Sequence, residues 1–220
     1  MTRGPPEPHP IRPPSTYIHS TMAIIKGTLK ADILIGTAAA DQFHVNNAGD
    51  VIVGGNNQDQ VLSTLASYQL QDGLGSLVLG SGADIGIGND LANRLGGNQR
   101  NNMLDGGAGQ DELTGGGGAD VFRFSHAGQA HADFVTDFQV GIDRIAINGA
   151  AFGLAAGTQV SYELNQQATT GAPTFIRMGS AGTAQAIYFD RDGIGAEKPQ
   201  LLCTLQTFAG ATSAADFAII

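Results

Sequence analysis

Residues 106–123 read GGAGQDELT followed by GGGGADVFR, two consecutive copies of the pattern G-G-x-G-x-D-x-U-x, in which U is apolar. The sixth position holds Asp111 and then Asp120, and the eighth holds Leu113 and then Phe122. A glycine-rich run turns tightly because glycine tolerates positive φ. The x-U-x part fits a short strand with one side chain pointing inward. Two units therefore predict one coil of a solenoid, about eighteen residues long.

The nine-residue spacing extends towards the N-terminus of this stretch. Counting back in nines from Asp120 and Asp111 reaches Asn102, Asn93 and Asp84. Two positions after these five residues come, in chain order, Gly86, Leu95, Leu104, Leu113 and Phe122. A regular register with in-phase apolar positions argues against the alternative of a disordered glycine-rich linker.

Stacked coils lie about 4.8 Å apart, so loops about eighteen residues apart gather their carboxylates and carbonyls on one side. Carboxylates at such distances repel one another unless a cation neutralises them. Ca²⁺ suits a flexible cage of oxygen ligands better than Mg²⁺ does. We expect Asp111 to share an ion with Asn93, and Asp120 with Asn102. The candidate metal ligands in the repeats are Gly106, Gly107, Gly109, Asp111, Gly115, Gly116, Gly118, Asp120, Asn93 and Asn102.

An earlier array has the same period but a different phase. Asp32, Asp41, Asp50 and Asp59 are spaced by nine, and the residues two positions later are Leu34, Phe43, Ile52 and Val61. Asp59 and Asp84 are 25 residues apart, which is not a multiple of nine. Glycines are sparse in this array. We interpret it as degenerate coils that keep the strand and core pattern, and whether they bind calcium stays open.

Composition narrows the classes of function. The chain has 220 residues, 32 glycines and a formal charge of −9, which argues against nucleic acid as a partner. The charge also predicts a self-repelling, poorly folded protein without metal. A single cysteine, Cys203, excludes internal disulfides, so bound metal is expected to stabilise the fold instead. No run of eighteen apolar residues is present, so a transmembrane segment is not expected.

The nonapeptide resembles the calcium-binding repeat of RTX (hemolysin-type) proteins. Residues 133–145, DFVTDFQVGIDRI, resemble the element that closes the β-roll in serralysin-type proteases and in the R-modules of secreted alginate epimerases. The resemblance implies an all-β fold, a parallel β-roll with a C-terminal antiparallel β cap, and Ca²⁺ as the bound ion. It also implies that Asp133 can be a further calcium ligand. The alternative for Asp133 is a solvated position on an edge strand.

The C-terminal third shows strand and turn signals. We expect strands at Gln159–Leu164, Thr174–Met178, Ala186–Phe189 and Leu201–Leu205. The sequence DRDG at 190–193 favours a hairpin turn over an EF-hand, because glycine falls at the fourth loop position and leucine at the twelfth. The tail 214–220, AADFAII, resembles the uncleaved C-terminal signal of proteins exported by type I (ABC-type) systems. This resemblance implies a secreted, extracellular bacterial protein.

The expected organisation has four parts. Residues 1–21 are proline-rich without the apolar core of a signal peptide, so we expect a disordered extension. The other parts are a degenerate repeat and strand segment at 22–80, the RTX calcium-binding β-roll at 81–132, and the C-terminal β cap with its secretion signal at 133–220.

No catalytic motif is found: H-E-x-x-H, G-x-S-x-G and the P-loop are all absent from the sequence. The first hypothesis is a non-enzymatic calcium-binding RTX protein that folds on binding Ca²⁺ outside the cell. The alternative is the accessory C-terminal RTX region of a secreted exoenzyme (protease, lipase or epimerase) whose catalytic part is absent here. The expected partners are calcium ions and an ABC-type exporter, and the sequence does not name an extracellular partner.

Overall fold

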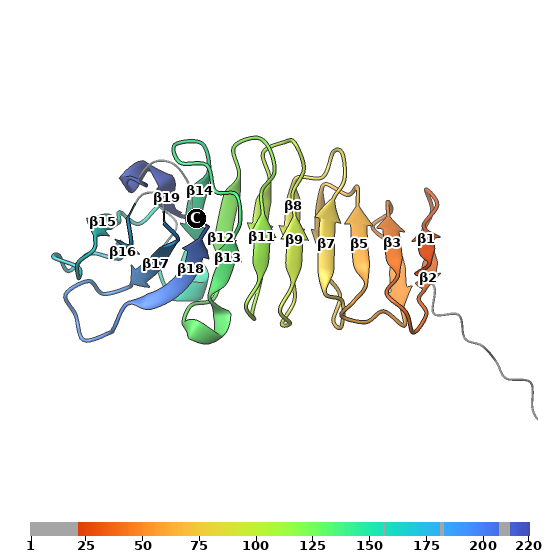
Figure 1. Cartoon of the computed structure of the whole chain (residues 1–220), viewed down its shortest axis with the longest axis horizontal. Coiled ribbons are helices and arrows are strands. Elements are labelled where there is room, and N and C mark those ends of the chain that lie inside the picture. Colours follow the sequence, from red (N-terminus) through yellow and green to blue (C-terminus); the bar gives the residue numbers. More distant parts are fainter. Residues whose placement is uncertain (1–21, 156, 181–182, 207–211) are drawn as a thin grey trace, which may run out of the picture.

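The computed structural model describes residues 22–155, 157–180, 183–206 and 212–220, so the predicted extension at 1–21 lies outside the described residues. The described chain is a long row of short strands with a wider end at the C-terminal third (Figure 1). It contains no α-helix in these ranges, and only three short 3-10 turns, at Gln129–His131, Gly149–Phe152 and Ala214–Asp216. The predicted all-β fold is confirmed.

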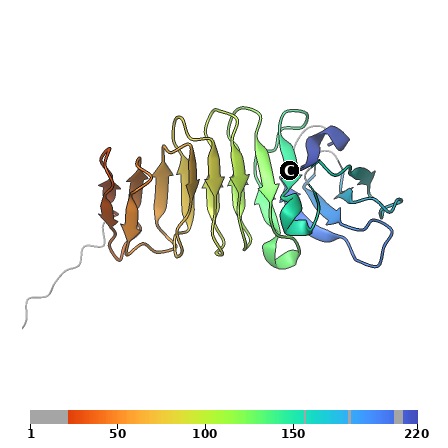
Figure 2. The same cartoon turned by 180° about the vertical axis from the view of Figure 1, so that it is seen from behind.

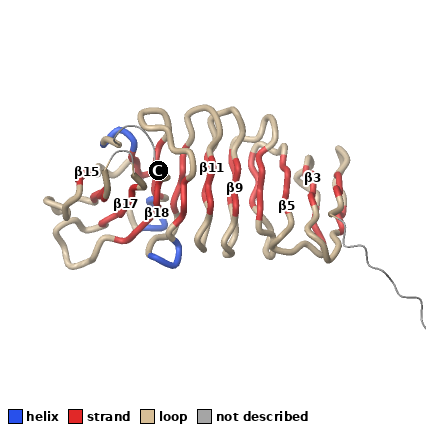
Figure 3. The backbone as a smooth tube through the Cα atoms, in the orientation of Figure 1, coloured by secondary structure: helices blue, strands red, loops and turns tan. Residues whose placement is uncertain are grey.

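The larger of the two main sheets has eleven strands and runs the whole length of the molecule (Figure 3). Its first seven strands, in spatial order, are β1 (Ile24–Lys26), β3 (Gln42–Val45), β5 (Gln60–Ser63), β7 (Ser76–Leu79), β9 (Arg94–Gly96), β11 (Glu112–Thr114) and β13 (Asp133–Val135). The sheet continues through β18 (Gln200–Leu205), β17 (Gln185–Asp190), β16 (Thr174–Met178) and β15 (Ser161–Leu164).

The even-numbered strands of the roll form the opposite wall, which is seen from behind in Figure 2. Five of them, together with β19 of the cap, make one sheet in the order β6 (Ser67–Gln69), β8 (Ile85–Ile87), β10 (Met103–Asp105), β12 (Val121–Phe124), β14 (Arg144–Ile147) and β19 (Phe217–Ile219). The remaining pair, β2 (Ile33–Ile35) and β4 (Val51–Val53), is a separate two-stranded sheet. All pairs within these two sheets are parallel.

The register of the strands gives the expected coil. Glu112 lies opposite Arg94, and Val121 lies opposite Met103, so each coil is eighteen residues long in the repeat region. The eighth repeat position points into the roll, and its residues are the main part of the core. The described core includes Leu34, Phe43, Ile52, Val61, Leu95, Leu104, Leu113 and Phe122, none more than 9% exposed.

The phase change between the two arrays is taken up within a single turn. Gln60 lies opposite Ser76, a step of sixteen residues, whereas Gln42 to Gln60 and Ser76 to Arg94 are steps of eighteen. The shortening falls in residues 64–66. The first residue of β6 comes seven residues after the first residue of β5, whereas the neighbouring strands begin nine residues apart. The odd-numbered sheet passes through this short coil without a break, whereas β4 and β6 do not pair. Both arrays therefore belong to one roll.

The cap is built on both sheets of the roll. Strand β18 pairs in parallel with β13, and β19 pairs in parallel with β14. The β16–β17 and β17–β18 pairs are antiparallel as predicted, whereas β15 pairs with β16 in parallel. The predicted span Thr174–Met178 matches β16 residue for residue.

Candidate metal centre

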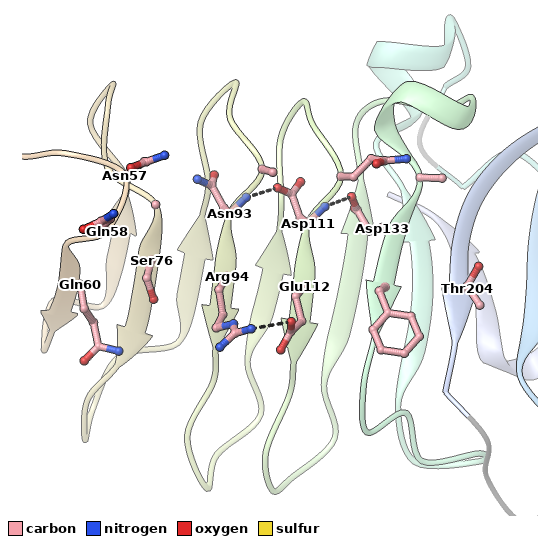
Figure 4. Close-up of a pocket in the computed structure, with 15 residues that line it drawn as sticks. Asn57, Gln58, Gln60, Ser76, Asn93, Arg94, Asp111, Glu112, Asp133 and Thr204 are labelled. Carbon is pink, nitrogen blue, oxygen red and sulfur yellow. Dashed lines mark hydrogen bonds and ion pairs between the residues drawn. The ribbon is translucent and has the colours of Figure 1, made fainter. Parts of the chain in front are cut away.

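A ladder of carboxylates joins the coils of the roll at the sixth repeat position. The backbone N–H of Asn93 donates to Asp111 Oδ1 at 2.7 Å, and that of Asn102 donates to Asp120 Oδ1 at 2.7 Å. Figure 4 shows the Asn93–Asp111 contact and the next one, from Asp111 to Asp133. The other donor–acceptor pairs of the ladder are Ala23–Asp41, Asp32–Asp50, Asp41–Asp59 and Asp120–Asp143. One oxygen of each of these carboxylates therefore has a structural role that needs no metal.

In most coils the loop's own backbone occupies the second oxygen. The N–H groups of Asn46 and Asn47 donate to Asp50 Oδ2, each at 3.1 Å. In loop 97–102 the N–H of Asn98 donates to Asn102 Oδ1 at 2.7 Å. Equivalent donor–acceptor pairs are Thr28–Asp32, Thr37–Asp41, Asn56–Asp59, Asn89–Asn93 and Gln139–Asp143. We call these amide-closed loops, because a loop amide satisfies the side-chain oxygen that faces the loop.

Loop 106–111 is arranged differently. Gly107, at the second repeat position, has a φ of 91°, a value that favours glycine. Its N–H donates to Asp105 Oδ1 at 3.1 Å instead of to Asp111. Asp111 is 2% exposed, and its Oδ2 is buried without a hydrogen-bond partner.

Loop 115–120 repeats this arrangement. Gly116 has a φ of 90°, and its N–H donates to Asp137 Oδ2 at 2.8 Å. Asp120 is 1% exposed, and its Oδ2 is likewise buried without a hydrogen-bond partner. We call 106–111 and 115–120 open loops, because their sixth-position carboxylate keeps one free buried oxygen.

Glycine at the first repeat position leaves room beside each free oxygen. A Cβ placed on Gly106 would overlap Asp111 Oδ2, and a Cβ on Gly115 would overlap Asp120 Oδ2. The preceding coil approaches closely as well, since a Cβ on Gly107 would come within 2.5 Å of the Asn89 carbonyl oxygen. A buried carboxylate oxygen beside closely stacked carbonyls is a donor set suited to a hard cation.

The charges in these loops are costly without a cation. Burial, together with the carboxylates of Asp143 and Asp137, raises the pKa of Asp120 to about 6, although the N–H of Asn102 partly offsets the rise. Burial also raises the pKa of both Asp111 and Asp133, and these two carboxylates repel each other. Negative charge accumulates because the two members of each pair, Asp111 with Asp133 and Asp120 with Asp143, lie on successive coils. Figure 4 shows this for Asp111 and Asp133.

The described basic side chains do not neutralise these carboxylates. The ion pairs found among the described residues are Arg94–Glu112, Arg100–Asp84, Arg123–Asp105 and Arg191–Glu197. Nor do three His, Cys, Asp or Glu side chains converge as a metal-binding group anywhere in the described ranges. A cation in the open loops would therefore take many of its ligands from backbone carbonyls.

The predicted ligands fall into two groups. The two aspartates of the open loops combine burial with a free oxygen, and their glycines line the same loops. Asn93 and Asn102 are buried neighbours of these aspartates, but each Oδ1 already accepts a loop N–H. Asp133 is 4% exposed, in a strand paired on both sides, so the alternative of a solvated edge position is wrong.

Sequence reasoning missed three aspartates that shape these loops. Asp105 and Asp137 accept the N–H groups of the open loops, and Asp143 accepts the N–H of Asp120. Asp105 directly precedes a repeat, and the other two lie in the 133–145 element, so position alone could have indicated them. Sequence reasoning also gave no role to His131, whose Nδ1 accepts the N–H of Gly109 at 3.0 Å and so helps to hold an open loop.

Residues 27–205 match a family described as the C-terminal region of serralysin, a peptidase of family M10. The chain belongs to the serralysin C-terminal family. The predicted resemblance to RTX-type proteins is thereby confirmed, and the family represents the non-catalytic part of serralysin-like proteins. A search of curated proteins found no match.

One similar solved structure is the AlgE6R3 subunit of the mannuronan C5-epimerase from Azotobacter vinelandii, with 27% identity and a TM-score of 0.37. The match covers 76% of this chain and 80% of that one. In the described part of the chain, no helix is long and apolar enough to cross a bilayer.

Proposed function

We propose that this serralysin C-terminal family member is a calcium-binding RTX protein that folds when Ca²⁺ fills its open loops. The observation that carries the proposal is the pair of buried, unpartnered oxygens, Asp111 Oδ2 and Asp120 Oδ2. A buried carboxylate oxygen without a partner is costly, and a bound cation removes that cost. The carbonyl-rich surroundings favour Ca²⁺, which accepts six to eight oxygens in flexible geometry, over Mg²⁺, which requires a near-ideal octahedron.

The ions would lie between neighbouring loops on the same side of the roll. Asp111 and Asp133 would supply carboxylate ligands on one side of the roll, and Asp120 and Asp143 would supply them on the other side. The glycines of the open loops would supply carbonyl oxygens. Since the open geometry exists only in the folded chain, binding energy and folding energy are coupled.

A titration tests this proposal directly. In excess chelator the protein should lack a cooperative unfolding transition, and it should gain β-type circular dichroism on addition of Ca²⁺. The midpoint is expected near about 10⁻⁴–10⁻³ M, the range of extracellular calcium modules. Magnesium at the same concentration serves as the control. A protein that is fully β and cooperatively stable in chelator would contradict the proposal.

We further propose export by an ABC-type (type I) system and folding outside the cell. The tail forms β19, in which Phe217 stacks on Tyr162 with ring centroids 5.0 Å apart. A signal in this strand could be read only before the cap folds, which agrees with transport of an unfolded chain at low cytosolic calcium. Deletion of residues 206–220 should abolish secretion beside a matching exporter and impair calcium-induced folding. Normal secretion of the truncated chain would remove the export role.

The second candidate function is the accessory C-terminal region of a secreted exoenzyme, and the family match itself favours it. In that case the roll would assist a catalytic part encoded with it or beside it. The neighbouring genes and the mass of the secreted product distinguish the candidates. An adjacent exporter without an enzyme supports the independent protein, whereas a fused or adjacent hydrolase or epimerase supports the accessory role.

A further inference from the structure

A second pair of carboxylates with buried oxygen atoms lies in the cap, outside the repeats. Strand β17 ends at Asp190, and Asp192 lies two residues later, in the connection to β18. The connection does join antiparallel strands, as the predicted hairpin turn requires. Asp190 is 3% exposed, and strand β18 separates β17 from β13, so the group is apart from the open loops.

Both carboxylates keep a free oxygen. Asp190 Oδ1 and Asp192 Oδ1 are each buried without a hydrogen-bond partner. The same condition marks Asp111 and Asp120 in the open loops. Burial, followed by the adjacent Asp192 carboxylate, raises the pKa of Asp190. Two neighbouring carboxylates with free buried oxygens require either a shared proton or a cation.

The basic residue within the connection is committed elsewhere. Arg191 pairs with Glu197, with Nε 3.0 Å from Oε2. The N–H of Glu197 donates to Asp192 Oδ2 at 3.2 Å, which orients that carboxylate and leaves its Oδ1 free. The Arg191–Glu197 pair therefore closes the outer part of the connection without neutralising the two aspartates.

The neighbouring segment offers uncharged oxygens. A Cβ on Gly193 would overlap the Thr170 carbonyl oxygen and would lie 2.7 Å from that of Ala172. The φ of Gly193 is 64°, so glycine is favoured here both for conformation and for space. The N–H of Ile194 donates to the Thr170 carbonyl at 2.9 Å, which fixes the two segments against each other.

We propose that Asp190 and Asp192 form a calcium site of the cap, separate from the sites of the roll. The carbonyl oxygens of Thr170 and Ala172, which lie beside Gly193, would be the uncharged ligands. Each accepts one hydrogen bond, from the Ile194 N–H and the Thr174 hydroxyl, and keeps a second lone pair. The site selects Ca²⁺ over Mg²⁺ because the free carboxylate oxygens are inaccessible to water, and Mg²⁺ gives up its water ligands reluctantly. Its role is to clamp the connection 190–199 onto residues 170–173.

Two measurements on the full-length protein test the site. The first is the number of calcium ions bound per chain, measured by equilibrium dialysis. Asp190→Asn/Asp192→Asn should bind one ion fewer than the unmodified protein. The matched control is Asp72→Asn, which removes one charge at an exposed position and should leave the number unchanged. An unchanged number in the double variant would overturn the proposal and point to a shared proton.

The second measurement is amide hydrogen exchange at residues 170–173 and 190–197 of the unmodified protein. Calcium should slow exchange in these segments about tenfold or more, and magnesium should not. This readout stands even if substitution of the buried Asp190 prevents folding, and the milder Asp192→Asn should lose most of the protection. Equal exchange in calcium and magnesium would contradict the site.

The cap site and the roll sites are separable by a third variant. Asp111→Asn/Asp120→Asn removes the free carboxylate oxygens of the open loops but leaves those of the cap. If the roll did not bind calcium, this variant would bind the same number of ions as the unmodified protein. The one-ion loss in the cap variant would still be expected.

Discussion

Loops 97–102 and 115–120 are neighbours on one side of the roll, and the Asn102–Asp120 hydrogen bond joins them. In the first, Asn98 at the second position directs its N–H to the sixth residue. In the second, Gly116 takes a φ of 90° and its N–H turns away, so Asp120 Oδ2 stays free. The comparison teaches that the backbone at the start of the loop decides whether the sixth side chain keeps a free oxygen. The acidic residue alone does not. Loop 54–59 fits this, because Gly55 is its second residue and the N–H of the third, Asn56, closes it.

The same contrast separates two regions of the molecule. The loops of the N-terminal array are amide-closed, and the open loops lie next to the cap. In an amide-closed loop the turn is further fixed by its own side chains; for example, Asn98 Oδ1 accepts the N–H of Arg100 at 2.8 Å. The sixth-position oxygens of these coils accept hydrogen bonds from protein groups. Metal dependence should therefore concentrate in residues 106–120, not follow the number of aspartates.

The largest expected effect on the calcium midpoint comes from replacing the sixth-position aspartate of an open loop with asparagine, compared with the same replacement in an amide-closed loop. Asp120→Asn should raise the calcium midpoint on the order of 100-fold, because a charged ligand is lost. Asp50→Asn should leave the midpoint unchanged but destabilise the protein by about 1–3 kcal/mol, since its amide would face the N–H donors of Asn46 and Asn47. Calcium titration and denaturant unfolding in saturating calcium measure the two effects. Equal midpoint shifts would remove the distinction between the loops.

A second prediction concerns glycine at positive φ. Gly116 and Gly82 have φ values of 90° and 93°, but a Cβ on Gly116 would overlap the Asn98 carbonyl oxygen, whereas one on Gly82 would meet nothing within 4 Å. Both alanine variants should lose about 1–2 kcal/mol from the backbone conformation. Only Gly116→Ala should also raise the calcium midpoint, by about tenfold. The calcium titration of Gly82→Ala is the control, and a matching shift there would show that strain alone is responsible.

The third prediction is a pH dependence of calcium binding. The folded pKa of Asp120 is about 6, above its ordinary value of 3.8, so protonation stabilises the metal-free fold below about pH 4, and this stabilisation is lost as the pH rises through 6. Protons and calcium compete for the carboxylate. The calcium midpoint should therefore rise up to about tenfold per pH unit below pH 6. Titrations between pH 5 and 7 measure this, and a constant midpoint would contradict it.

The smallest effect is expected on the outer face of the same coil. Glu112 pairs with Arg94 at 2.9 Å, with side chains 41% and 70% exposed. Glu112→Gln should change stability by no more than about 0.5 kcal/mol and leave the calcium midpoint unchanged. Asp105→Asn, which weakens the acceptor of the Gly107 N–H, is the contrasting variant, and its midpoint should rise about tenfold. A comparable shift in Glu112→Gln would show that net charge governs binding instead of loop geometry.

Much of the fold could be predicted because the nine-residue period fixes both strand position and inward face. Leu104 and Phe122 are buried as the period requires, and the Thr174–Met178 strand was bounded by turn residues on both sides. The short turn 64–66 could not be predicted. A phase change in the repeat is compatible with the end of a sheet and also with a coil that has fewer residues, and the sequence does not distinguish the two. Packing of β7 against β5 decides that question.

The candidate site was predictable in part. The G-G-x-G signature identified loops 106–111 and 115–120, where the free oxygens are found. The partners that draw the loop amides away could not be derived from the repeat, because Asp137 lies 21 residues beyond Gly116. The free oxygens of Asp190 and Asp192 depend on where the Arg191 side chain lies, and the local sequence does not show that.

The hydrogen bonds of the carboxylate ladder all run in one direction along the chain. The N–H belongs to the earlier coil and the accepting carboxylate to the later one, as in Asn93 to Asp111 and Asp111 to Asp133. A ribosome releases the earlier coil first, so each coil emerges with a backbone amide that only residues not yet made can satisfy. Nascent coils are thus incomplete until their successors arrive. For the same reason, loss of a C-terminal coil leaves a backbone N–H of the remaining roll without its acceptor, whereas loss of an N-terminal coil leaves a carboxylate oxygen without its donor.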